Sequence, residues 1–295
     1  MFLLLSFQKK DNDLDKELID QFIISSLKED VGDGDHTSLA TIPADAVGKA
    51  KLLVKDYGVL AGVELAAEIF HVIDPQFKLN IFLKDGAVVK PKDVAFEVEG
   101  NVRNILTAER LVLNCMQRMS GIATKTREIV DLLKGTNTKV LDTRKTTPGM
   151  RYFEKWAVRI GGGVNHRFGL YDMILIKDNH VDYAGGIREA IESARNYVTG
   201  LNKKLAIEIE VRNLEEVEQV LQTGGVDRIL LDNFGFDELC TAVNIIEGRY
   251  ITEASGGITV DNIRRYADCG VDYISVGALT HSVKSLDLSL KAVKA

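Results

Sequence analysis

The sequence predicts an α/β protein in which a TIM-type barrel follows a smaller N-terminal α/β domain. Beyond about residue 138, short apolar runs that end in polar residues alternate with helical segments, which is the pattern of parallel strands joined by helices. The first third of the chain mixes helices and strands without such a repeat. No Gly-x-Gly-x-x-Gly follows a first strand, which argues against a dinucleotide-binding Rossmann domain.

In the N-terminal part, the elements follow from the spacing of apolar side chains. Apolar residues recur at helical spacing between 13 and 30 and predict a helix, which is followed by a loop over 29–38. The apolar segment Met1–Phe7 is expected to form a strand or to lead into that helix. The other elements expected here are strands at 47–54, 57–60, 77–83 and 94–99, a helix over Val63–Ile73, and a helix that opens at Thr107 with a capping-box-like start.

The barrel elements are six apolar runs and the helical segments between them. The expected strands are Lys139–Asp142, Met173–Ile176, Leu205–Val211, Arg228–Asp232, Tyr250–Ser255 and Tyr273–Gly277. The expected helices are 184–198, 213–223, 236–247 and 259–269. Strands of this kind are buried on both faces, so we expect them to form a parallel sheet.

Composition and charge exclude several classes of protein. The 295 residues carry a net charge of −6, which argues against non-specific binding to nucleic acid or to anionic membranes. No apolar run approaches the ~18 residues of a membrane span. Lys9 and Lys10 follow the apolar start rather than precede it, which is the wrong order for a signal peptide. We therefore expect a cytoplasmic protein.

The cysteines give no sign of a disulfide framework or of a structural zinc site. Cys115, Cys240 and Cys269 are odd in number and lack Cys-x-x-Cys spacing. We therefore expect all three to be buried free thiols.

Polar residues gather where the expected barrel strands end, which is where active sites of such barrels lie. Glu208 and Glu210 alternate onto one face of their strand, and one of them could be only a structural hydrogen-bond acceptor. The residues at these ends are Asp142, Arg144, Lys145, Lys177, Asp178, Asn179, His180, Glu208, Glu210, Asp232, Asn233, Glu253, Ser255, Ser275 and Gly277.

Charge and glycine patterns indicate a phosphorylated, anionic ligand. The window from Arg144 to His180 has a net charge of +4, whereas the rest of the chain is acidic. Ser255–Gly257 and Ser275–Ala278 each precede an expected helix, and backbone N–H groups at such places bind phosphate. Glu210 and Asp232 could hold Mg²⁺ through water or bind ribose hydroxyls. These features predict an enzyme that acts on a phosphorylated sugar and a second, anionic substrate.

Several longer motifs at these positions identify a resemblance. The motifs are Glu29–Thr37, Ala108–Leu111, Asp142–Gly149 (DTRKTTPG), Gly161–Leu170 (GGGVNHRFGL), Ile176–His180, Leu231–Asn233 and Glu253–Ile258. With them the sequence closely resembles the quinolinate phosphoribosyltransferase family, essentially from end to end.

The resemblance implies a fold, a reaction and an assembly. It implies an incomplete, seven-stranded α/β barrel over 114–278, an N-terminal α/β sandwich over 1–113, and a C-terminal segment, 279–295, that packs back on the sandwich. The family joins quinolinate to 5-phosphoribosyl-1-pyrophosphate with Mg²⁺ and releases pyrophosphate and CO₂, giving nicotinate mononucleotide for NAD synthesis. The resemblance also implies a homodimer with shared active sites, and it leaves a higher oligomer open.

The resemblance also implies roles for individual residues. Quinolinate would be bound by Thr143, Arg144, Lys145, His166, Arg167 and Lys177, together with Arg110 from the neighbouring subunit. Phosphoribosyl pyrophosphate would be bound by Lys145, Lys177, Glu210, Asp232, Ser255, Gly256, Gly257, Val276, Gly277 and Ala278. The catalytic set would be Lys145, Lys177, Glu210 and Asp232, and the last two would hold the metal indirectly.

Two alternatives remain open at this point. One is a relative with the same fold and another acceptor, such as the molybdenum-transport-associated homologues or nicotinate phosphoribosyltransferase; the set of arginines suited to a dicarboxylate favours quinolinate. The other is a phosphate-binding barrel without catalysis. Lys145, Lys177, Glu210 and Asp232 argue against it, because simple binding would not need both signs of charge at the sugar.

Overall fold

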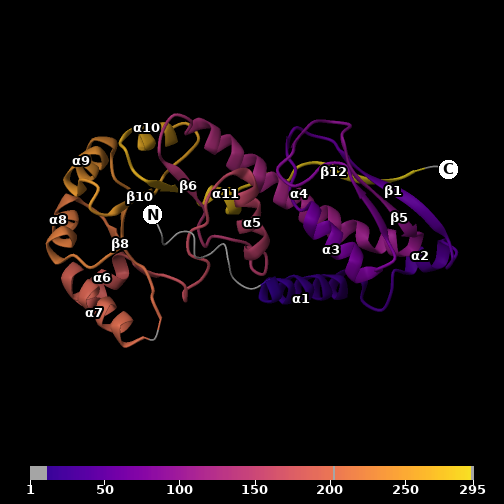
Figure 1. The fold of residues 1–295 in the computed structure, drawn as a ribbon, viewed down its shortest axis with the longest axis horizontal. Helices are drawn as coiled ribbons and strands as arrows, with labels where there is room; N and C mark the ends of the chain where they lie inside the picture. Colours follow the sequence, from indigo (N-terminus) through magenta and orange to yellow (C-terminus); the bar gives the residue numbers. More distant parts are fainter. Residues whose placement is uncertain (1–11, 202, 294–295) are drawn as a thin grey trace. The chain divides into compact units, whose positions relative to one another are not determined.

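The structure is a computed structural model, and it describes residues 12–201 and 203–293. The chain divides into two compact units, Met1–Gly121 with Ser285–Ala295, and Ile122–Lys284 (Figure 1). The expectation for Met1–Phe7 lies outside the described residues. No helix in the described part of the chain is long and apolar enough to cross a membrane. The domain limits expected at 113 and 278 stay predictions.

The first unit is built on a four-stranded antiparallel sheet in the order β12-β1-β5-β3. Its strands are β1 (Val47–Val54), β3 (Lys78–Ile81), β5 (Val94–Asn101) and β12 (Leu288–Ala292), and β2 (Gly58–Val59) pairs with β4 (Val88–Val89) in a second, small sheet. Its helices are α1 (Asn12–Val31), α2 (His36–Thr41) and α3 (Val63–Ile73), and α4 (Val102–Leu132) continues into the second unit. The chain thus returns at its end to pair with β1.

One face of this sheet forms the core of the first unit. Ala50, Leu52 and Val54 alternate along β1 with more exposed residues and are buried. Phe70 of α3 packs edge-to-face on Phe96 of β5, with ring centroids 5.9 Å apart. Period-two burial of this kind is what a half-covered antiparallel sheet requires.

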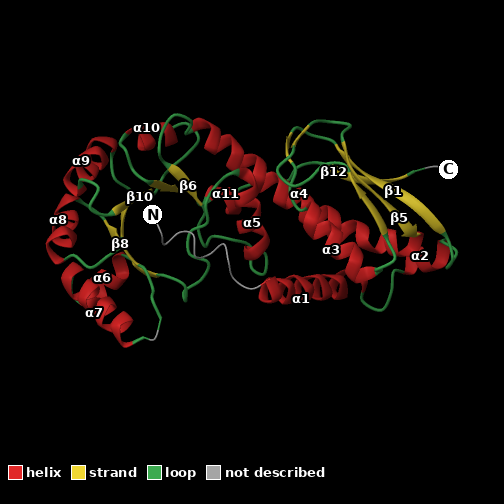
Figure 2. Cartoon of the chain, in the orientation of Figure 1, coloured by secondary structure: helices red, strands yellow, loops and turns green. Residues whose placement is uncertain are grey.

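The second unit contains a six-stranded parallel sheet in the order β6-β11-β10-β9-β8-β7. The strands are β6 (Lys139–Leu141), β7 (Ile174–Ile176), β8 (Ile207–Val211), β9 (Arg228–Asp232), β10 (Ile251–Ser255) and β11 (Tyr273–Ser275). Its helices are α5 (Arg151–Gly161), α6 (Asp178–Ala184), α7 (Ile187–Gly200), α8 (Leu214–Thr223), α9 (Phe236–Ile246), α10 (Ile263–Asp268) and α11 (Ala278–His281). Figure 2 shows helices α7 to α10 along the outside of the strands. Because all six strands are parallel, their carboxyl ends meet at one edge.

Several predicted helices have other limits in the structure. Helix α4 begins at Val102, five residues before Thr107, and the segment expected as one helix over 184–198 is divided between α6 and α7. The break falls at Gly185 and Gly186, whose φ angles of 99° and 145° suit glycine rather than a helix. Helix α10 is shorter than 259–269, and α2 and α5 have no counterpart in the expected elements. The loop expected to run to position 38 ends at Asp35, whose side chain accepts a hydrogen bond from the Ser38 N–H and caps α2.

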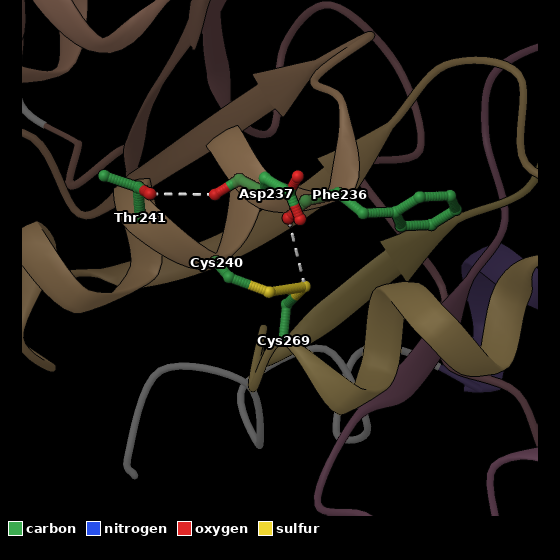
Figure 3. Close-up of a disulfide and its surroundings, with 5 residues drawn as sticks. All are labelled: Phe236, Asp237, Cys240, Thr241 and Cys269. Atoms are coloured by element: carbon green, nitrogen blue, oxygen red, sulfur yellow. Dashed lines mark hydrogen bonds between the residues drawn. A yellow bond between two sulfur atoms is a disulfide. The ribbon is translucent and has the colours of Figure 1, made fainter.

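The expectation of three free thiols is wrong for two of them. Cys240 of α9 and Cys269 at the end of α10 form a disulfide, with Cα atoms 4.7 Å apart, and the Sγ atom of Cys269 also contacts the Phe236 carbonyl (Figure 3). These residues are 29 positions apart, and the packing of successive strand–helix units brings them together. Spacing along the sequence gives no signal of that approach. Cys115 is free and buried, as expected.

Candidate active site

The carboxyl edge of the parallel sheet brings together most of the residues predicted for the site. Asp232 ends β9, Ser255 ends β10, and the two are register partners in neighbouring strands. Glu210 lies near the end of β8, beside β9 in the sheet. Arg110 is an exposed residue of α4 in the first unit, whereas the other residues named here belong to the second unit.

The loop after β6 presents two cations. Arg144 and Lys145 are exposed, and their side chains form no hydrogen bond or ion pair with the residues that the structure describes. The backbone that carries them is fixed, because the Lys145 N–H donates to Thr143 Oγ1 at 3.1 Å and the Thr280 hydroxyl donates to the Lys145 carbonyl at 2.8 Å. Two unpaired cations on a fixed loop are suited to binding an anion.

A buried network joins this loop to the loop that carries His166 and Arg167. Asp142 is buried, pairs with Lys155, and accepts hydrogen bonds from the His166 N–H at 2.8 Å and from Asn165 Nδ2 at 2.5 Å. Burial raises the pKa of the Asp142 carboxyl, and Lys155 acts against that rise. Lys155 contributes to the positive window of the sequence, but its partners make it part of the scaffold.

Arg167 has a hydrogen-bond partner but no ion-pair partner among the described residues. Its Nη1 donates to the Met173 carbonyl at 3.2 Å. Burial lowers the pKa of the Arg167 guanidinium, and the like charge of Arg144 lowers it further. Because the two guanidinium groups repel each other, a dianion that contacts both would be bound favourably. Arg151, which donates to the carbonyls of Phe168 and Arg144, ties the two loops together.

His166 lies in a buried cluster of charges below the rim. Its Nε2 is 3.0 Å from Glu208 Oε2 and 3.4 Å from Glu253 Oε2, and its Nδ1 accepts a hydrogen bond from the Arg167 N–H at 2.7 Å. Burial lowers the pKa of the His166 ring, whereas Glu253 and Glu208 raise it and bring it to about 9. The Arg167 N–H acts against this rise, because a second proton on Nδ1 would remove its acceptor. The two buried carboxylates outweigh these effects, so the net shift of the His166 pKa is upward.

Arg228 completes this cluster. Its Nη1 donates to Glu253 Oε2 at 2.7 Å, its Nε lies 3.8 Å from Glu208 Oε1, and its guanidinium stacks over the Tyr273 ring at 4.8 Å. Burial raises the pKa of Glu253, but His166 and Arg228 lower it to about 2. Burial and the neighbouring Glu253 raise the pKa of Glu208.

The cluster also bears on the question of a metal. Donor atoms of His166, Glu208 and Glu253 lie within 4.8 Å of one another, an arrangement that could hold a cation. Arg228 already supplies a positive charge to both carboxylates, so the group is an ion-pair cluster. Of the two glutamates on β8, Glu208 is therefore the structural one and Glu210 the one at the rim.

Glu210 and Asp232 are the carboxylates nearest the end of the strands. Lys177 Nζ donates to Glu210 Oε2 at 2.9 Å, and Asn233 Nδ2 donates to Asp232 Oδ2 at 2.6 Å. Each carboxylate keeps one oxygen without a hydrogen-bond donor among the described residues. Hard oxygen donors on neighbouring strands fit Mg²⁺ or sugar hydroxyls.

The glycine loops that follow β10 and β11 lie against other residues of the site. Gly256 and Gly257 have φ angles of 92° and 60°, which side-chain-bearing residues rarely adopt. A Cβ atom at Gly277 would come within 3.2 Å of Lys145 Cδ, so this glycine leaves space for the lysine side chain. A side chain at Gly256 would collide with Asn233, and one at Gly277 would press on Lys145, so each loop has a glycine where it lies close to another residue of the site.

A cavity of about 320 Å³ lies beside β7, α6 and α7, and Arg167 and His180 are among the residues that line it. Its other walls are mainly apolar side chains, among them Met173, Ile174 and Ile176. Such walls are unsuited to two highly charged substrates, so we place the active site at the strand ends instead.

Comparison with known proteins gives the family. Models of the N-terminal and C-terminal domains of quinolinate phosphoribosyl transferase match residues 35–120 and 122–291. The chain is 46% identical over 282 residues to quinolinate phosphoribosyltransferase [decarboxylating] 2, mitochondrial, of Nicotiana glauca, a match that covers 90% of this chain and 80% of the relative. It is 42% identical over 275 residues to the probable nicotinate-nucleotide pyrophosphorylase [carboxylating] of Bacillus subtilis (strain 168), covering 93% and 92% of the two chains.

Solved structures agree with these matches. The nicotinate-nucleotide pyrophosphorylase from Francisella tularensis superposes with a TM-score of 0.88 at 39% identity, over 97% of this chain and 98% of that one. A human nicotinic acid phosphoribosyltransferase shares the fold, with a TM-score of 0.57, at only 13% identity over 88% of this chain and 72% of that one. Both domain models and relatives of near-complete coverage converge, and the chain belongs to the quinolinate phosphoribosyltransferase family.

Proposed function

We propose that this protein transfers the phosphoribosyl group of 5-phosphoribosyl-1-pyrophosphate to quinolinate, with decarboxylation, to give nicotinate mononucleotide, pyrophosphate and CO₂. The observation that carries the proposal is that cations without a protein partner and carboxylates with an oxygen available to a ligand lie at the same edge of the sheet. Arg144 and Lys145 have no partner among the described side chains, while Glu210 and Asp232 each keep an oxygen for a ligand. The names of the relatives support the same reaction.

Quinolinate is a dianion, and the cationic side of the site suits it. We assign its carboxylates to Arg144 and Arg167, whose mutual repulsion a dianion relieves. Thr143, Lys145, His166 and Lys177 complete the surroundings of the ring. His166 does so with both ring nitrogens engaged by protein groups, so it shapes the site and holds the backbone of Arg167.

Phosphoribosyl pyrophosphate takes the remaining part of the rim. We assign its 5-phosphate to the backbone of Ser255, Gly256, Gly257, Val276, Gly277 and Ala278, and its ribose and pyrophosphate to Lys145, Lys177, Glu210 and Asp232. The anomeric carbon gains positive charge as pyrophosphate leaves, and the carboxylates stabilise that charge. Lys145 and Lys177 stabilise the negative charge of the leaving group. Catalysis of this kind rests on positioning and electrostatics, without a covalent intermediate on the protein.

Mg²⁺ belongs to the same proposal. Glu210 and Asp232 would hold it, through water and the pyrophosphate, because their unbonded oxygens are hard ligands at neighbouring strand ends. When bound, the ion supplies positive charge against the pyrophosphate.

Decarboxylation follows from the first step. Attack of the pyridine nitrogen on the anomeric carbon forms the C–N bond while the C–O bond to pyrophosphate breaks, and the ring becomes cationic. The C–C bond to the adjacent carboxylate then breaks, its electron pair passes toward the cationic ring, and that carbon takes up a proton. The protein's part is to keep the ring oriented between Arg144 and Arg167.

A direct assay tests the reaction. The purified protein is incubated with quinolinate, phosphoribosyl pyrophosphate and Mg²⁺, and nicotinate mononucleotide and CO₂ are measured. Formation of both products in equal amounts is expected. Absence of both, with a folded protein and each substrate confirmed intact, would refute the proposal.

We also propose a homodimer in which Arg110 reaches the partner's active site. Its exposure on α4, within the other unit, is compatible with that role. Mixing an Arg110→Ala chain with a Lys145→Ala chain should then regenerate sites that carry neither change, and activity should return. Two inactive variants that stay inactive after exchange of subunits would contradict the shared site.

The finer features of fold and location are proposals as well. Val164 forms a parallel bridge with Leu141 beside β6, and we take it as the seventh strand of an open barrel. Superposition of a crystal structure would test that count. A cytoplasmic location can be tested by cell fractionation.

A further inference from the structure

Asn233, at the end of β9, combines an unusual backbone with an exposed position at the site. Its φ angle is 57°, in the left-handed region that few residues other than glycine adopt. Among the described residues, Lys92 and Glu247 are the other non-glycine residues with positive φ, and both lie elsewhere. Asparagine tolerates this conformation better than most residues, so the backbone alone explains why a small polar residue is present.

The left-handed backbone does not account for the side-chain contacts of Asn233. Its Nδ2 donates to Asp232 Oδ2 at 2.6 Å, and its backbone N–H donates to the Ser255 carbonyl at 2.9 Å. A Cβ atom placed on Gly256 would collide with the Asn233 side chain, so the glycine backbone lies directly against it. One residue therefore touches both the rim carboxylate of β9 and the glycine loop of β10.

These contacts fix two groups relative to each other. A carboxylate can rotate about its last bond, but the amide of Asn233 holds one oxygen of Asp232 and leaves the other in a defined direction. The N–H bond to the Ser255 carbonyl sets where the Ser255–Gly257 loop begins. A sugar phosphate that contacts both the carboxylate and the loop needs this spacing to be constant.

We propose that Asn233 is a positioning residue for phosphoribosyl pyrophosphate: its amide orients Asp232 toward the ribose, and its backbone and side chain hold the glycine loop at the distance that the 5-phosphate requires. This inference rests on the function proposed above. Asn233 touches no reacting atom, and it acts through Asp232 and through the loop.

The competing explanation is that Asn233 is present only because it tolerates the left-handed backbone of the turn. Substitution by glycine distinguishes this explanation from a positioning role. Glycine adopts a φ of 57° without strain, so Asn233→Gly should keep or raise the melting temperature. A turn-only residue would then leave the kinetics unchanged. A positioning residue would lose its amide, and loss of a hydrogen bond to a charged group corresponds to roughly a tenfold or larger effect.

The experiment compares Asn233→Gly and Asn233→Asp with the unchanged protein. Asn233→Asp keeps the shape but replaces the amide donor with a second carboxylate beside Asp232. The matched control is Asn104→Asp, which removes a comparable amide-to-carboxylate bond, from Asn104 Nδ2 to Asp74 at 3.1 Å, in the first unit. Steady-state kinetics for each substrate, calorimetric binding of phosphoribosyl pyrophosphate with Mg²⁺, and melting temperatures are measured.

Both Asn233 variants should raise the KM or the Kd for phosphoribosyl pyrophosphate about tenfold or more, with the KM for quinolinate within about twofold and a melting temperature no lower for Asn233→Gly. Asn104→Asp should leave both KM values unchanged. If the unchanged protein makes nicotinate mononucleotide, normal kinetics in Asn233→Gly would overturn the inference. Equal losses for both substrates would overturn it as well. An unchanged protein without that activity would instead refute the proposed function.

Discussion

The parallel sheet holds charged side chains at two levels that differ in how they are neutralised. In the interior, Glu208 and Glu253 are matched by His166 and Arg228 at distances of 2.7 to 3.8 Å. At the carboxyl edge, Arg144 and Lys145 have no partner among the described residues. Charge alone therefore does not identify a ligand site. What distinguishes the edge is that Arg144 and Lys145 have no partner among the described residues, although Glu210 at the same edge is paired with Lys177.

The two levels should respond to substitution in opposite ways. Removal of one member of a buried, matched set leaves another charge without a partner in a low dielectric, which destabilises the fold. Removal of an unmatched charge at the edge relieves repulsion and should affect mainly the ligand. The predictions below test this contrast.

Arg228→Met should have the largest effect on stability. The change leaves Glu253 and Glu208 without their guanidinium partner, and breaking a buried pair of this kind costs about 3–5 kcal/mol. Denaturant unfolding followed by circular dichroism measures the loss. Lys134→Met, which breaks the exposed pair with Asp131, is the control and should cost less than about 1 kcal/mol. Equal losses in the two variants would show that the interior cluster is not special.

Asp232→Asn and Glu210→Gln should have the largest effect on turnover. Each keeps its shape but loses the charge that the proposed function assigns to the ribose and the metal-linked pyrophosphate, and loss of one such electrostatic group lowers kcat by roughly 100- to 1000-fold. The melting temperature should change little. Asp272→Asn, which weakens bonds to Thr252 near the start of β10, should do the reverse and lower the melting temperature with near-normal kcat. A structural role for the rim pair would appear as a large fall in melting temperature with normal turnover.

The contrast also explains what the sequence could predict. Parallel strands and the polar residues at their ends are local patterns, so the sheet, Glu210, Asp232 and both glycine loops were accessible to sequence reasoning. Sequence reasoning could not decide which of Glu208 and Glu210 is structural, because the answer depends on Arg228, which lies twenty positions after Glu208 on the next strand. Helix α5 was not predicted from the sequence, although its buried apolar residues Phe153, Ala157 and Val158 have helical spacing.

Partners across the fold account for the other errors. Lys155 is one of the positive charges in the window from Arg144 to His180, and only its burial against Asp142 shows that it serves the scaffold. Cys240 and Cys269 meet because α9 and α10 pack side by side. The importance of Asn233 could have been noticed in the Leu231–Asn233 motif, since an asparagine directly after a strand is a common site of left-handed backbone.

Discrimination between quinolinate and nicotinate should come next in size. Nicotinate has one carboxylate, so the second of the two arginines, Arg144 or Arg167, would stay unmatched in the complex. Leaving such a donor unpaired corresponds to roughly 30- to 1000-fold in kcat/KM. Competition assays with both acids measure the ratio, and comparable kcat/KM values would contradict a site organised for a dicarboxylate.

Arg144→Lys should have the smallest effect and should change one substrate only. The change keeps the positive charge but replaces a planar fork with a point charge, so a bidentate contact with a carboxylate becomes a single one. We expect the KM for quinolinate to rise about tenfold, the worth of one charge-assisted hydrogen bond, with the KM for phosphoribosyl pyrophosphate nearly constant. The melting temperature should not fall, because Arg144 has no partner among the described side chains to lose. Arg249→Lys is the matched control and should leave both KM values unchanged; this residue follows α9, and its guanidinium donates to the Ile245 and Ile246 carbonyls. Unaltered quinolinate kinetics in Arg144→Lys would mean that the edge cations act only through their net charge. The bidentate geometry of the Arg144 guanidinium would then have no role in binding.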